Sequence, residues 1–151
     1  MSELLWLQTS PRPGEWPESV IACRVRATCR GDAEQVLARA KEALERVLEV
    51  DPQAWPSNEE WARRLPPWFV ARCAPQTAET ANVGEGRWTL ANWVYWFLPE
   101  QRFWVWWNAR LPDPNTLLVY VVVDGWPFPW GALDWLLRAS GAVETELVNA
   151  E

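Results

Sequence analysis

The stretch VIACRVRATCRGDAEQVLARAKEALERVLEV, residues 20–50, decides the predicted fold. Its first part alternates apolar and polar side chains, which is typical of a half-buried strand, so we expect a strand at 19–30. The apolar spacing then changes to that of an amphipathic helix. Asp32 and Gln35 predict a capping box at its start, and Asp51 marks its end. The chain therefore begins its ordered part with a strand followed by a long helix.

Shorter elements are expected on both sides of this pair. Residues 1–18 are expected to be irregular except for a short edge strand at Leu4–Leu7, and residues 74–87 to form a flexible loop. Further strands are predicted at 88–98, 102–111, 116–123 and 142–148, with 116–123 central because it is apolar on both faces. Further helices are predicted at Asn58–Leu65 after a capping box of Ser57 and Glu60, at Trp68–Cys73 after Pro67, and from Pro129 to a terminal Gly141.

The resulting order is β-α-β-β-β-α-β, interrupted by short helices. It predicts one α+β domain spanning residues 1–151, with a mostly antiparallel sheet of about five strands and helices packed on one face. The order resembles a ferredoxin-like arrangement that has gained an extra strand and an inserted helical segment. A chain of this length buries enough surface to fold without a metal or a disulfide.

Composition excludes several classes of function. The chain has no histidine, so Ser-His-Asp triads and His-ligated metals are excluded. Its net charge of −6, from 14 basic and 20 acidic residues, argues against nucleic acid and anionic membranes as partners. The chain shows no signal peptide, membrane span or CxxC motif, so we expect a reduced, cytoplasmic protein that binds neither metal nor cofactor.

The three cysteines are predicted to be packing residues rather than catalytic ones. Cys23 and Cys29 share the apolar face of the strand at 19–30, about 20 Å apart, so they cannot form a disulfide and are expected to pack as small hydrophobes. Cys73 follows Arg72, which could lower the pKa of its thiol, but no partner base is evident. We therefore expect a protein that is not an enzyme; an enzyme built on this chain would use carboxylates or Cys73.

Tryptophan is the main anomaly, with 14 residues against 2 tyrosines and 4 phenylalanines. Trp104 and Trp106 share one face of the strand at 102–111, and its other face is also aromatic. Two interpretations stay open: a core rich in tryptophan and capped by arginine, or an open aromatic surface that binds a ligand, a partner or a second copy. A second aromatic concentration is DGWPFPWGALDW at 124–135, which could pack under the last helix or insert into a partner.

Two hypotheses for function follow. Residues 112–151 hold six acidic residues and one basic residue, a net charge of −5. The first hypothesis is a small acidic protein-binding module, such as an inhibitor or immunity-type protein, that caps a basic site on a protein partner. The alternative is a binder of a small ligand or carbohydrate in an indole-lined pocket. The candidate binding residues are Trp126, Phe128, Trp130, Asp124, Asp134, Trp104 and Trp106.

Overall fold

Four antiparallel strands form one open sheet in the order β2-β3-β1-β4. The computed structural model describes residues 3–9, 21–74, 88–123, 125 and 128–148. The strands are β1 (Ile21–Thr28), β2 (Trp104–Asp113), β3 (Thr116–Val123) and β4 (Glu144–Val148). The helices are α1 (Glu3–Thr9), α2 (Ala33–Leu48), α3 (Asn58–Arg64), α4 (Pro67–Arg72), α5 (Leu90–Tyr95) and α6 (Gly131–Ser140), with a 3-10 turn, η2 (Pro99–Gln101).

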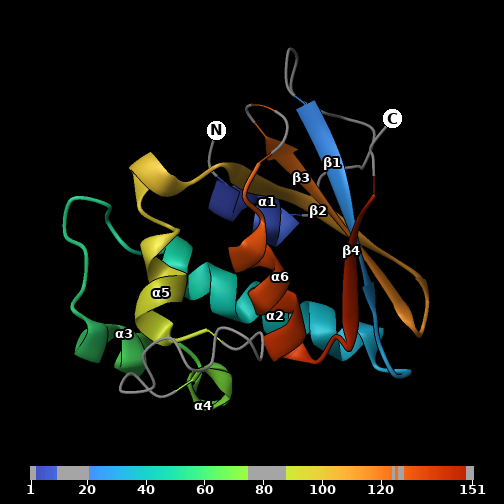
Figure 1. Ribbon diagram of the computed structural model, residues 1–151, viewed down its shortest axis with the longest axis horizontal. Coiled ribbons are helices and arrows are strands. Elements are labelled where there is room, and N and C mark those ends of the chain that lie inside the picture. The colour runs from blue at the N-terminus through green and yellow to red at the C-terminus, as the bar shows by residue number, and fades with distance from the viewer. Residues whose placement is uncertain (1–2, 10–20, 75–87, 124, 126–127, 149–151) are drawn as a thin grey trace.

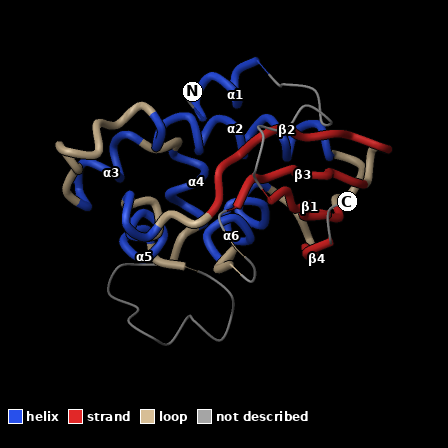
Figure 2. The backbone as a smooth tube through the Cα atoms, turned by 90° about the horizontal axis from the view of Figure 1, so that it is seen from above, coloured by secondary structure: helices blue, strands red, loops and turns tan. Residues whose placement is uncertain are grey.

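The fold is α+β, as the sequence predicts. The elements β1, α2, β2, β3, α6 and β4 follow the β-α-β-β-α-β order of a split β-α-β arrangement. Helices α2 and α6 pack against each other, and α2 also contacts β2 and β3 (Figure 1). The inserted helices α3, α4 and α5 gather on the side of α2 and α6 that lies away from the strands (Figure 2).

The alternation at the start of the fold is confirmed in β1. Cys23, Val25 and Ala27 are buried in the core, where they pair with Val121, Val119 and Leu117 of β3. The intervening Arg26 is exposed on the opposite face and forms an ion pair of 2.6 Å with Glu146 of β4. Strand β3 lies between β1 and β2, so its predicted central position is also confirmed.

The strand predicted at 88–98 is wrong, because this segment contains helix α5. The side-chain Oγ1 of Thr89 accepts a hydrogen bond of 3.2 Å from Asn92 N and caps the N-terminus of this helix. The buried residues Leu90, Trp93, Val94 and Phe97 recur at helical spacing and face the core. The described sheet therefore has four strands, and the additional strand of the predicted order is absent from it.

The edge strand predicted at Leu4–Leu7 is also wrong, because these residues belong to α1. One carboxylate oxygen of Glu3 accepts hydrogen bonds from the backbone N–H of Trp106 at 2.8 Å and from the Arg102 guanidinium at 2.5 Å. Strand β2 is the edge of the sheet, so an exposed backbone N–H there is a site for unwanted strand pairing. Helix α1 covers this edge instead of extending it.

Some of the helix ends predicted from the sequence are observed and others are not. Ser57 caps α3 by accepting from Glu60 N at 3.2 Å, which is one half of the predicted capping box; the Glu60 carboxylate accepts from Arg64 at 3.3 Å. Asp32 precedes α2, but its carboxylate accepts from Arg30 N at 3.1 Å, so the predicted capping box is not formed. Helix α6 begins at Gly131 rather than Pro129, and it ends as predicted at Gly141, whose φ of +127° favours glycine.

Candidate functional site

The tryptophans gather inside the described part of the molecule. Trp16 and Trp126 lie outside the described residues, and each of the other twelve is buried or half-buried. The buried ones are Trp61, Trp93, Trp104, Trp106, Trp107 and Trp135. The half-buried ones are Trp6, Trp55, Trp68, Trp88, Trp96 and Trp130. These indoles therefore supply core and core margin, which agrees with the first of the two interpretations of the aromatic pattern.

One group of indoles also encloses a pocket of about 180 Å³. It lies where the segments around α5, η2, the start of β2 and the start of α6 meet. Three of its described lining residues are tryptophans: Trp88 and Trp96 flank α5, and Trp104 begins β2. Its described lining consists of Trp88, Trp96, Gln101, Trp104, Pro129, Gly131 and Ala132.

Backbone and side-chain contacts hold this wall in place. The carbonyl of Trp88 accepts a hydrogen bond of 2.8 Å from Ala74 N, which ties it to the segment after α4. The buried Trp93 of α5 donates its Nε1–H to the carbonyl of Ala132 at 2.9 Å. This second bond joins α5 to the first turn of α6, so the two sides of the pocket are fixed to each other.

Gly131 lets an indole approach the helix closely. A Cβ atom at this position would lie 2.8 Å from Cζ2 of Trp88, which is closer than real Cβ contacts, and 3.2 Å from its Cη2. The six-membered ring of Trp88 thus lies directly against the start of α6. The glycine allows this close contact, because a side chain at this position would require the Trp88 ring to shift.

The described lining of the pocket is uncharged. Besides the indole N–H groups of its tryptophans, Gln101 is its one polar side chain, and it is half-buried. The next residue in the chain is a cation: the Arg102 guanidinium lies 4.4 Å from the centroid of the Trp104 ring and is paired with Glu3. Both side chains of this ion pair are almost buried, at 13% and 11% exposure. The site therefore suits a neutral, mainly apolar group.

The residues predicted from the sequence as a binding site do not come together at one site in the structure. Trp104 lines the pocket, whereas Trp106 is fully buried in the core. Phe128 is buried, and Trp130 is half-buried at the position before α6. The predictions at Asp124 and Trp126 lie outside the described residues. Sequence reasoning missed Trp88, Trp96 and Gln101, because nothing in the local pattern indicates that they meet the start of α6.

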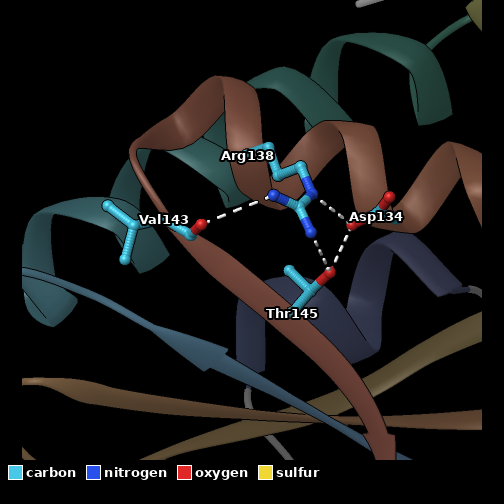
Figure 3. A network of polar contacts seen from close by, with 4 residues as sticks. All are labelled: Asp134, Arg138, Val143 and Thr145. Carbon is cyan, nitrogen blue, oxygen red and sulfur yellow. Dashed lines mark hydrogen bonds and ion pairs between the residues drawn. The ribbon is translucent and has the colours of Figure 1, made fainter. Parts of the chain in front are cut away.

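Asp134, the remaining predicted binding residue, takes part in a network between α6 and β4 (Figure 3). Its Oδ1 accepts from Arg138 Nε at 2.8 Å and from the hydroxyl of Thr145. The same guanidinium also donates to the Thr145 hydroxyl at 3.3 Å and to the Val143 carbonyl at 3.4 Å. This carboxylate holds β4 against α6 and is not directed at the indole-lined pocket.

The cysteines are placed as packing residues. Burial raises the pKa of the Cys23 thiol, and burial together with the nearby Asp32 carboxylate raises the pKa of Cys29. Both thiols are therefore protonated at neutral pH, which makes them poor nucleophiles. Cys73 is buried as well. In the described ranges, no three or more cysteine, aspartate or glutamate side chains come together as metal ligands.

Two further findings concern the chain as a whole. None of the helices in the described ranges is long and apolar enough to cross a bilayer. Comparison of the sequence and structure with protein-family models, curated proteins and solved structures finds no match in any of the three.

Proposed function

We propose that this protein binds a small, ring-sized, uncharged ligand in the indole-lined pocket. The observation that carries the proposal is the convergence of Trp88, Trp96 and Trp104 on one pocket of about 180 Å³. Ligand sites in proteins are concave and mostly apolar, with a few polar groups that orient the ligand. Gln101 is the candidate for that orienting group here.

The size of the pocket limits the ligand. Pockets for drug-sized molecules occupy about 300–1,000 Å³. A cavity of about 150 Å³ is enough to bind benzene. The present volume of about 180 Å³ therefore suits one six-membered ring with a small substituent.

Local structure supports a site rather than a packing defect. Proteins fill space efficiently, and a methyl group at position 131 would meet the Trp88 ring at 2.8 Å. The glycine at this position brings an indole to the helix start while the space beside it stays open. The hydrogen bond from Trp93 to Ala132 holds this geometry from the opposite side.

The hypothesis of an acidic module that caps a basic partner stays a prediction. Two of its residues, Asp124 and Trp126, lie outside the described residues. Of the others, Phe128 is buried and Asp134 is engaged by Arg138 and Thr145. These side chains are used within the chain, so the pocket is the better supported site.

Isothermal titration calorimetry with ring-sized probes tests the proposal. The probes are p-cresol, 4-methylcyclohexanol and methyl β-glucoside. We expect saturable binding of at least one probe at a single site, weakened about tenfold or more by Trp96→Ala, because that change removes one wall of the pocket.

Trp55→Ala is the matched control, because Trp55 is also half-buried but packs against Trp61, away from the pocket. It should leave the affinity unchanged. Absence of binding by every probe, or equal weakening by both variants, would contradict the proposed function.

A further inference from the structure

Aromatic rings run in sequence through the interior to the pocket. Trp68 contacts Phe69 at 5.8 Å between centroids, Phe69 contacts Trp93 at 4.5 Å, and Trp93 contacts Phe97 at 4.6 Å. Phe97 then contacts Trp104 at 5.8 Å. The planes of successive rings are inclined by 52° to 86°. We call this series the ring ladder.

The ring ladder ends at a wall of the pocket, because Trp104 is both its last member and a lining residue. Tilted and edge-to-face contacts are favoured between aromatic rings, because the positive ring edge meets the negative ring face. A ring bound beside Trp104 would become the next member of the ladder. The pocket therefore offers an aromatic ligand the same type of contact that holds the core together.

The described lining disfavours a sugar. A pyranose carries several hydroxyl groups, and each one that is buried without a partner weakens binding. The indole N–H groups of the described lining can only donate, so the amide of Gln101 is the one side chain there that can accept a hydrogen bond from a sugar hydroxyl. A ring with a single polar substituent matches this lining better.

The surroundings also disfavour a cation. Arg102 already lies 4.4 Å from the Trp104 ring centroid and 4.8 Å from that of Phe97. Gly131 and Ala132, which line the pocket, begin α6, and the first turn of a helix carries partial positive charge. A quaternary ammonium group would have to share the Trp104 ring with Arg102, although the charge of Arg102 is paired with Glu3.

We propose that the pocket binds one uncharged aromatic ring with a single hydrogen-bonding substituent, of the phenol class. The ring packs against Trp104, and its hydroxyl pairs with the amide of Gln101. This inference rests on the proposed function and names the chemical class of its ligand. Gln101 is accordingly the residue that selects for the substituent.

The test compares matched probes by calorimetry on the full chain. p-Cresol and 4-methylcyclohexanol have similar size and each carries one hydroxyl, but only the first is aromatic. We expect p-cresol to bind about threefold to tenfold more tightly than 4-methylcyclohexanol. Tetramethylammonium and methyl β-glucoside are expected to bind more weakly than p-cresol. Equal or tighter binding of 4-methylcyclohexanol or methyl β-glucoside would overturn the inference while the proposed function stands. Equal or tighter binding of tetramethylammonium, or absence of all binding, would overturn both.

A variant tests the role of the amide. Gln101→Leu keeps the approximate size of the side chain and should weaken p-cresol binding about threefold to tenfold, as expected for one lost hydrogen bond. The affinity for toluene, which lacks the hydroxyl, should not fall. A variant that binds p-cresol and toluene as the wild type does would overturn the assignment of Gln101.

A last comparison distinguishes a peptide side chain from a free small molecule as the source of the bound ring. N-acetyl-tyrosinamide carries the same phenol ring on a peptide backbone. Tighter binding of this compound than of p-cresol would support the inference with the ring supplied by a peptide side chain. Tighter binding of p-cresol would support it with the ring supplied by a free small molecule.

Discussion

Two regions of the molecule are built from different side chains. The aliphatic region, formed by β1, β3 and α2, packs valine, alanine, leucine and cysteine at low exposure. The aromatic region, formed by α4, α5 and the start of β2, packs the ring ladder. Small branched side chains interdigitate closely, whereas large rigid rings meet at angles. The indole-lined pocket lies at the end of the aromatic region, where rings that meet at angles leave space between them.

The largest expected effect tests whether the rings carry the aromatic region. Trp93 is fully buried, contacts two members of the ladder and donates to Ala132. Trp93→Ala should reduce the free energy of unfolding by about 3–5 kcal/mol. Val25→Ala, at an equally buried position in β1, should cost about 2 kcal/mol. Urea denaturation measures both. A smaller loss for Trp93→Ala than for Val25→Ala would contradict the role of the rings in stabilising the aromatic region.

The next effect concerns the ion pair that joins α1 to the aromatic region. Glu3→Ala leaves the nearly buried Arg102 without its carboxylate and uncovers the backbone N–H of Trp106. We expect a loss of about 3 kcal/mol in the free energy of unfolding. The control is Glu60→Ala, which removes an exposed pair with Arg64 and should cost below about 1 kcal/mol. Equal losses in urea denaturation would show that α1 does not protect the sheet edge.

Two glycine substitutions, one next to each region, are expected to have effects of intermediate size on stability. Gly141→Ala forces a side chain onto a φ of +127° and places Cβ 3.1 Å from Val36 Cγ2, so we expect a loss of about 1–3 kcal/mol. Gly131→Ala lies at a helix start and should change stability by less than about 1 kcal/mol. It should nevertheless displace Trp88 and weaken p-cresol binding. Thermal unfolding measures the change in stability, and calorimetry measures the change in p-cresol binding. Unchanged binding in Gly131→Ala would contradict the described contact.

The smallest expected effect is at the network of Asp134. Its side chain and that of Arg138 are partly exposed, at 31% and 38%, so the pair is screened by solvent. Asp134→Asn should cost about 0.5–1 kcal/mol and leave p-cresol binding unchanged. Hydrogen exchange at the amides of β4 should become faster, because the contact to α6 is weaker. A loss of ligand affinity in this variant would place the residue in the binding site after all.

The sequence predicts the aliphatic region better than the aromatic one. The alternation in β1 and the spacing in α2 each satisfy one periodicity, and both elements are confirmed. The segment at 88–98 is apolar at nearly every position, so alternation and helical spacing compete, and strand was wrongly preferred. The signals for α5 were present, with Thr89 as the cap and Leu90, Trp93 and Phe97 at helical spacing.

The candidate site could be predicted only at Trp104. Trp88 and Trp96 belong to the segment that was assigned to a strand, so their meeting with Gly131 could not be foreseen. This contact depends on tertiary packing between residues far apart in the chain. By contrast, the burial of Cys23 and Cys29 follows from one strand face and was correctly predicted.

The indole N–H resonances report whether the end of the ring ladder binds a ligand. In a titration with p-cresol, heteronuclear NMR follows each tryptophan Nε1–H, assigned by single Trp→Phe variants. We expect saturable shifts at Trp88, Trp96 and Trp104, and none at Trp61. Absence of any shift, or shifts of equal size at Trp61, would contradict the account.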